Sequence, residues 1–176
     1  MTRRTMDRRA IRGAMAGLAL IGAWAVVSPA IATTVDKADH VVVRKSERKL
    51  YLMKGDNVLR TFKVALGLEP EGHKLAEGDF RTPEGSYTLE ERNADSDFFL
   101  AIRISYPNTA DAWRARSKGH APGGSIMIHG QPNSPTRTPE YYRRTDWTNG
   151  CIAVSNGDMV DIWLMTARNT PIDILP

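Results

Sequence analysis

Residues 146–154 read DWTNGCIAV and place a polar turn, a cysteine and a short apolar run side by side. The apolar run from Ile152 to Val154 predicts a three-residue strand. Cys151 therefore lies where the chain turns into a strand, directly after Gly150. This stretch predicts a β-rich fold that presents a thiol at the start of a strand.

A histidine has a comparable position earlier in the chain. Residues 125–128 predict another strand, and His129 follows it directly. A thiol has an unperturbed pKa of about 8.5, so it is mostly protonated at neutral pH and needs a base to become a good nucleophile. Cys151 and His129 are therefore a candidate nucleophile and base, and we expect the pKa of the thiol to be depressed. A buried, structural cysteine is the alternative interpretation.

The residues just before the cysteine predict support for acyl chemistry. Gly150 has no side chain, so we expect it to let a substrate carbonyl approach the backbone. The N–H groups of Asn149, Gly150 and Cys151 are candidate donors of an oxyanion hole. One such donor is typically worth roughly 3–4 kcal/mol in the transition state.

Charge and motifs argue against several other classes of protein. The 176-residue chain has 24 Lys and Arg and 20 Asp and Glu, and residues 1–32 hold five of the basic and one of the acidic residues. Residues 33–176 therefore have 19 of each, and a nucleic-acid protein with a basic patch is not expected. The four histidines lie far apart and no HExxH, CxxC or Walker motif occurs, so we expect neither a metal site nor a phosphate loop.

The remaining pattern predicts one mainly β domain with short helices, an α+β arrangement that opens with a meander. Asn108 predicts the cap of one helix over 109–118, and Ser155 with Asp158 predicts the start of another, with Met159, Ile162 and Trp163 on one face. Residues 66–82 and the proline-rich stretch between Gly130 and Cys151 are expected to be loops, the second a lid. The expected strands are 41–44, 49–53, 58–65, 86–90, 98–106, 125–128, 152–154 and 172–175.

The N-terminus has the layout of an export signal. Five arginines precede the uncharged run from Gly13 to Val27 and the small-residue pattern Ala30-Ile31-Ala32. The run is shorter than the roughly 20 residues that span a bilayer as a helix. We expect residues 1–32 to be a signal peptide cleaved after Ala32, and the mature protein to lie in the periplasm or cell envelope. An uncleaved anchor is the alternative, and the twin-arginine and general export routes both stay open.

Two motifs of this chain occur together in a known family. One is Ile128-His129-Gly130 followed by Thr148-Asn149-Gly150-Cys151-Ile152, and the other is Thr82-Pro83-Glu84-Gly85 with Tyr87. They resemble the HG…(S/T)-x-G-C and TPxG-(F/Y) segments of the L,D-transpeptidase (YkuD-type) catalytic domain. The resemblance covers roughly residues 40–176. Within the family the sequence looks most like a short periplasmic branch, which includes an enzyme that detaches the major outer-membrane lipoprotein from peptidoglycan.

The resemblance implies a sandwich or barrel-like catalytic domain at residues 40–176 that remodels the cell wall and influences cell shape. It implies acyl transfer on peptidoglycan stem peptides, in which Cys151 attacks the carbonyl of the third, diamino-acid residue and forms a thioester. His129 would take the thiol proton and later protonate the leaving amine. A backbone carbonyl near Gly130 or Thr148 would orient the imidazole. Neither a metal nor an organic cofactor is implied.

Two departures from the family leave the outcome of the reaction open. The family often has His before Gly-Cys and Arg two positions after Cys, where this chain has Asn149 and Ala153. A substrate contact used in crosslinking would then be missing. Hydrolytic detachment of lipoprotein-linked peptidoglycan therefore stands beside transpeptidation.

The arginines of the proline-rich segment bear on the same choice. Arg137, Arg143 and Arg144 are candidates for gripping the carboxylates of a protein-linked stem, or they form a solvated face. An exported wall-binding domain without turnover is the alternative from another functional class. The sequence does not indicate the oligomeric state.

Overall fold

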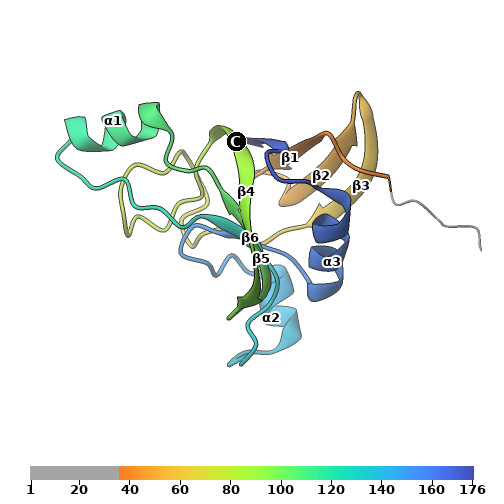
Figure 1. Ribbon diagram of the computed structural model, residues 1–176. Helices are drawn as coiled ribbons and strands as arrows, with labels where there is room; N and C mark the ends of the chain where they lie inside the picture. The colour runs from red at the N-terminus through yellow and green to blue at the C-terminus, as the bar shows by residue number, and fades with distance from the viewer. Residues whose placement is uncertain (1–35) are drawn as a thin grey trace, which may run out of the picture. The chain divides into compact units, whose positions relative to one another are not determined.

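The first three strands form the predicted antiparallel meander. In the computed structural model, which describes residues 36–176 (Figure 1), β1 (His40–Arg44), β2 (Lys49–Lys54) and β3 (Asn57–Lys63) pair in order. Alternate residues of β1 and β2 are fully buried, as expected for strands with one face on the core: Val41, Val43, Leu50 and Leu52. The expected signal peptide and its cleavage site lie outside the described residues.

The eight strands of the described residues form one mixed sheet. β8 (Pro171–Leu175) lies parallel to β1, and the order along the sheet is β3-β2-β1-β8-β4-β5-β6-β7. The later strands are β4 (Gly85–Ser96), β5 (Phe99–Ile104), β6 (Met127–His129) and β7 (Ile152–Ala153). Beyond β3, Ala65 and Ala153 exchange two backbone hydrogen bonds of 2.8 Å, so the two ends of the sheet meet. The predicted fold class, mainly β with short helices, is confirmed.

Strand β4 is much longer than the predicted strand over 86–90. Its first part pairs with β8 and its second part with β5, with register irregularities after Leu89 and Asn93. The second part is a charged stretch that lacks an apolar alternation, so its period cannot be identified from sequence. β4 therefore links the meander to the strands that end near Cys151 and His129.

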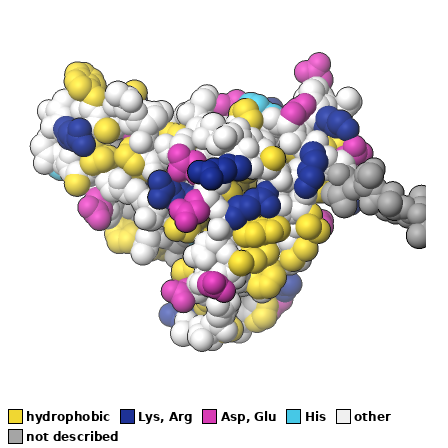
Figure 2. Space-filling model, in the orientation of Figure 1, with side chains coloured by type: hydrophobic (Ala, Val, Ile, Leu, Met, Phe, Trp, Pro, Cys, Tyr) yellow, Lys and Arg dark blue, Asp and Glu magenta, His cyan; other side chains and the backbone are white. Residues whose placement is uncertain are grey.

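The helix caps were predicted correctly. Asn108 forms a capping box with Asp111 at α1 (Thr109–Ser117), and Ser155 accepts from the Asp158 N–H at α3 (Asn156–Met165). Met159 and Ile162 of α3 are buried, but Trp163 is only half-buried, with the Arg92 guanidinium 4.9 Å from the ring centroid. Hydrophobic side chains gather over α3 in Figure 2, where Val160 and Leu164 are exposed.

Helix α2 (Pro139–Arg144) was not predicted, because three prolines indicated a continuous loop over 131–147. Pro139 occupies the first turn, where its missing N–H is not needed, and the Thr138 side chain accepts from the Tyr141 N–H at 3.3 Å. Tyr142 is buried, and its ring lies 5.1 Å from that of Trp147. No helix within residues 36–176 is long and apolar enough to cross a membrane.

Candidate active site

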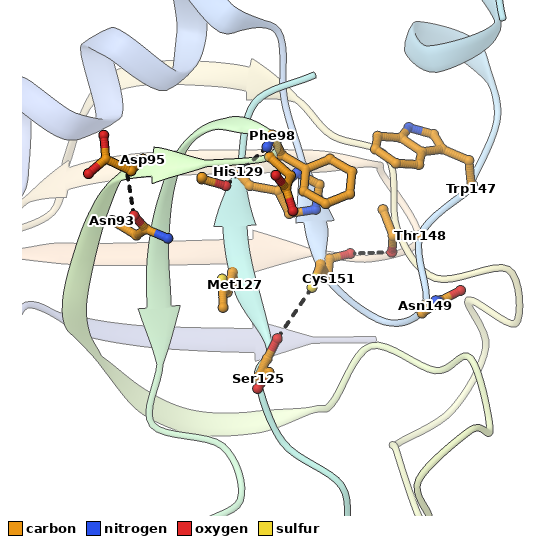
Figure 3. A pocket seen from close by; sticks show the side chains of 12 residues that line it. Asn93, Asp95, Phe98, Ser125, Met127, His129, Trp147, Thr148, Asn149 and Cys151 are labelled. Carbon is orange, nitrogen blue, oxygen red and sulfur yellow. Dashed lines mark hydrogen bonds between the residues drawn. The ribbon is translucent and has the colours of Figure 1, made fainter. Parts of the chain in front are cut away.

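Cys151 and His129 are brought together by two neighbouring parallel strands. β6 and β7 pair in the register Ile128↔Ile152 and His129↔Ala153, and Cys151 directly precedes β7. Both side chains line one cavity of about 380 Å³ (Figure 3). The other lining residues belong to the β4–β5 hairpin, the segment entering β6 and the turn before the cysteine: Asn93, Asp95, Ser96, Asp97, Phe98, Ser125, Met127, Trp147, Thr148 and Asn149.

The imidazole of His129 is fixed by one hydrogen bond and two aromatic rings. Its Nδ1 lies 2.7 Å from the carbonyl oxygen of Gly130, and the rings of Phe98 and Trp147 have centroids 4.6 and 5.7 Å away. Because Nδ1–H donates to this carbonyl, Nε2 is the nitrogen left as a proton acceptor. The side chain is 4% exposed, and burial lowers the pKa of His129, which favours the neutral imidazole.

The surroundings of Cys151 favour its protonated thiol in the free protein. Its Sγ atom lies 3.6 Å from the carbonyl oxygen of Ser125. Burial raises the pKa of the Cys151 thiol, and the Met127 N–H and the charge of Lys74 lower it only in part. The depressed pKa expected from sequence is therefore wrong for the free protein, because desolvation outweighs the nearby positive charge. A neutral thiol and a neutral imidazole line the cavity.

Thr148 builds the turn that positions the cysteine. Its buried hydroxyl donates to the Cys151 carbonyl oxygen at 2.7 Å and accepts from the Gly150 N–H at 3.1 Å. The Gly150 N–H is therefore already used and does not belong to an oxyanion hole in this geometry. The N–H groups of Asn149 and Cys151 make no hydrogen bond within residues 36–176 and are left as the candidate donors.

The two glycines of the motif are needed for packing against the rest of the fold. Gly150 has φ of +120°, and a Cβ there would lie 2.6 Å from the backbone oxygen of Arg81. A Cβ on Gly130 would lie 2.6 Å from Oδ1 of Asn156. Gly150 is therefore needed where the loop that contains Arg81 comes close to the chain, and its predicted role beside a substrate carbonyl stays a prediction.

Sequence reasoning gave no role to several residues that form this site. Asp146 accepts from the Leu66 N–H at 2.8 Å and pairs with Arg48 at 2.8 Å, which ties the turn before Thr148 to the chain leaving β3. Phe98, expected as the first residue of a strand, lies instead at the hairpin tip just before β5 and lines the cavity. Trp147 could have been noticed as an aromatic residue next to the cysteine motif. Among residues 36–176, no three His, Cys, Asp or Glu side chains are grouped to hold a metal ion.

Comparison with known proteins agrees with the motifs. Residues 38–174 match the family model YkuD, described as the L,D-transpeptidase catalytic domain. The chain belongs to this family. The resemblance inferred from the two motifs is therefore confirmed at the level of the family.

The individual relatives of this YkuD domain share at most a third of their aligned residues with it. YafK of Escherichia coli (strain K12), whose name gives its L,D-transpeptidase activity as unproven, is 33% identical over 97 residues, which are 52% of this chain and 37% of YafK. The crystal structure of Pgp2 from Campylobacter jejuni, a helical cell shape determining protein, has a TM-score of 0.58 and 26% identity, covering 77% of this chain and 46% of that one. An L,D-transpeptidase from Mycobacterium smegmatis has a TM-score of 0.52 at 15% identity, covering 78% and 58%, and shows the fold alone. The chain thus spans less than two thirds of the length of each of these relatives.

Residue 153, one of the two departures from the family, does not line the cavity beside Cys151 in this YkuD domain. Ala153 is buried and lines a separate hollow of about 70 Å³ shared with Gln131, Tyr142 and Arg143. Asn149, the other departure, does line the cavity.

The arginines of the proline-rich segment form the solvated face that was one of the two interpretations of the sequence. The Arg137 guanidinium is 5.7 Å from the ring centroid of Tyr141, Arg143 pairs with Glu140, and neither these arginines nor Arg144 line the cavity. Of the predicted lid between Gly130 and Cys151, the part that lines the cavity is its end, Trp147, Thr148 and Asn149. The opposite wall is formed by the β4–β5 hairpin, which was not predicted to take part.

Proposed function

We propose that this protein is an exported cell-wall enzyme that transfers the acyl group of a peptidoglycan stem peptide through a thioester on Cys151. The proposal rests on the cavity that Cys151 and His129 share, with Nδ1 of the imidazole held by Gly130. Membership of the L,D-transpeptidase family supports peptidoglycan as the substrate. The layout of residues 1–32 supports export with cleavage after Ala32.

Acylation begins from the neutral pair. Sγ of Cys151 attacks the carbonyl carbon of the third, diamino-acid residue while the S–H proton moves to Nε2 of His129. The oxyanion that forms accepts hydrogen bonds from the N–H groups of Asn149 and Cys151, which have no other acceptor within residues 36–176. The imidazolium then protonates the leaving amine, the C–N bond breaks, and the thioester remains.

Deacylation reverses these roles. An acceptor amine, or water, attacks the thioester carbonyl and gives a proton to Nε2 of His129. The C–S bond breaks, and the imidazolium returns the proton to sulfur, which regenerates the thiol. The product is a new peptide bond with an amine and a free carboxylate with water.

We favour transfer to an amine as the principal outcome and keep hydrolysis as the second. Hydrolytic detachment of lipoprotein was inferred partly from arginines that could hold the carboxylates of a protein-linked stem. Those arginines do not line the cavity beside Cys151. An acceptor amine must nevertheless be well positioned to compete with water at about 55 M, which effective molarities of 10⁵ M or more allow.

Incubation with tetrapeptide-stem muropeptides tests the proposal. We expect loss of the terminal residue and new crosslinks between diamino-acid residues, detected by mass spectrometry. Cys151→Ala should abolish turnover, and His129→Gln should lower it by about 10² or more, as expected for loss of a general base.

Lipoprotein-linked peptidoglycan serves as the parallel substrate. Release of lipoprotein without crosslinks would replace the transferase with the hydrolase. Binding to peptidoglycan without any turnover would support the wall-binding domain instead.

A further inference from the structure

The outer face of helix α3 is apolar although it is exposed. Val160 and Leu164 are 37% and 48% exposed, and Trp163, on the same face, is half-buried. The inner face of the helix packs Met159 and Ile162 into the core. A helix that is apolar on both faces is normally buried on both. The outer face, which we call the α3 patch, therefore has the composition of a contact surface: Val160, Trp163 and Leu164.

Positive charges border the α3 patch. The Arg92 guanidinium lies 4.9 Å from the Trp163 ring centroid and donates to the Thr166 carbonyl oxygen at 2.7 Å. Nζ of Lys37 donates to the Leu164 carbonyl oxygen. Figure 2 shows Lys and Arg side chains along the upper edge of the hydrophobic surface over α3. Neither Arg92 nor Lys37 takes part in an ion pair within residues 36–176.

The helix and the turn after it add one charge of each sign close to the patch. Asp161 lies three residues before Leu164, and the exposed Arg168 lies four residues after it. These two charges offset each other, so Lys37 and Arg92 leave an excess of positive charge. The α3 patch thus joins an aromatic ring and two aliphatic side chains to a basic border.

The described chain enters the fold at the same end of α3. The Ala38 N–H donates to the Met165 carbonyl oxygen at 2.7 Å, beside the last turn of the helix. Asp36 is four residues after Ala32, the last residue of the expected export signal, and four residues span at most about 14 Å. An export signal is held at the membrane until it is cleaved. This end of the fold is therefore the one next to the membrane during export.

We infer that the α3 patch binds the surface of an anionic lipid bilayer. Trp and aliphatic side chains insert at the boundary between headgroups and acyl chains, and Lys and Arg beside them attract anionic lipids. The inference goes beyond the proposed function, because it concerns the place where the enzyme works and not its reaction. The patch belongs to the folded domain, so it is present whether the leader is cleaved or kept.

Co-sedimentation of the exported protein with vesicles tests this inference. Vesicles of phosphatidylglycerol and phosphatidylcholine are compared with vesicles of phosphatidylcholine alone. We expect wild type to bind the anionic vesicles about tenfold or more tightly, and added salt to weaken that binding. The double variant Val160→Ser, Leu164→Ser should lower the affinity about tenfold, and Arg168→Gln should lower it about fivefold. Val58→Ser, at a 53% exposed position of β3, and Lys118→Gln, exposed after α1, are the matched controls and should bind as wild type does.

A fluorescent label separates binding by the patch from binding by a leader that is still attached. Cys151→Ala removes the single cysteine of the chain, and Leu164→Cys then takes a polarity-sensitive label on the patch. We expect the emission of this label to shift to the blue with anionic vesicles. The same label at Val58→Cys should not shift, because β3 lies in the meander half of the sheet.

Several results would overturn the inference. These are no vesicle binding by wild type, an unchanged affinity of the double variant, and an unshifted label at residue 164. A dimer that the double variant dissociates, without vesicle binding, would also overturn it, because a second copy would then cover the patch. Turnover of tetrapeptide-stem muropeptides should be the same in wild type and the double variant, since the α3 patch does not line the cavity beside Cys151. Vesicle binding by a wild type that turns over no muropeptide would overturn the proposed function alone.

Discussion

The two halves of the sheet are stabilised in different ways. In the meander half, β1, β2 and β8 have five or six residues each, and Val41, Leu50 and Ile172 are fully buried. In the catalytic half, β6 and β7 have three and two residues. Ile128 and Ile152 are fully buried there as well, and the turns add side chains that bond to backbone groups, above all Asp146 and Thr148. Single changes in turns should therefore cost more stability in the catalytic half than in the meander.

The largest difference is expected between two glycines with positive φ. Gly55 in the β2–β3 turn has φ of +56°, and a Cβ added there would meet nothing within 4 Å, so Gly55→Ala should cost about 1 kcal/mol. Gly150 has φ of +120°, and its added Cβ would lie 2.6 Å from a backbone oxygen, so Gly150→Ala should cost about 4 kcal/mol from strain and overlap. Urea unfolding of both variants measures this. Equal losses of unfolding free energy in the two variants would show that the turn before Cys151 tolerates a Cβ atom as well as the β2–β3 turn does.

A smaller difference is expected between two aspartates that accept from backbone N–H groups. Asp39 in the meander half is exposed and accepts from the Gly55 N–H at 2.8 Å, so Asp39→Ala should cost about 0.5 kcal/mol. Asp146→Ala removes the acceptor of the Leu66 N–H and the partner of Arg48, and should cost about 2 kcal/mol. Turnover should fall with Asp146→Ala and stay unchanged with Asp39→Ala. A larger loss of unfolding free energy in Asp39→Ala than in Asp146→Ala would contradict the proposed difference between the two halves of the sheet.

The same contrast explains what could be predicted from sequence. The meander and the caps at Asn108 and Ser155 are encoded locally, by alternation and by side chains that bond to nearby N–H groups. The second part of β4 depends on its pairing with β5, which no local pattern shows. Helix α2 was hidden by prolines that a short helix tolerates in its first turn.

The candidate site divides in a similar way. Cys151 and His129 were found because each follows or precedes a recognisable strand within a motif. The direction of the thiol pKa was predicted wrongly, because it depends on burial by residues far away in the chain. The β4–β5 hairpin tip that lines the cavity was missed, because from sequence it is indistinguishable from an ordinary polar turn.

The last and smallest effect concerns the reactivity of Cys151 with iodoacetamide. Burial raises the pKa of the Cys151 thiol, so the fraction of thiolate at pH 7 is lower in the folded protein than in the unfolded chain. Each unit by which the pKa rises lowers this fraction about tenfold. Alkylation of the folded protein at pH 7 should therefore be several-fold slower than in urea, and it should accelerate as the pH rises above the usual range of a thiol. His129→Gln should change the alkylation rate of the folded protein by less than about twofold, because a neutral imidazole supplies no charge to stabilise a thiolate.

A control thiol in the meander half, Asp56→Cys in a Cys151→Ala background, should react at the rate of an ordinary exposed cysteine. Faster alkylation of Cys151 than of this control at pH 6–7, together with slowing by His129→Gln, would show a preformed thiolate–imidazolium pair. Cys151 and His129 in the catalytic half would then be ions in the free protein, and acylation would begin without the proton transfer to His129.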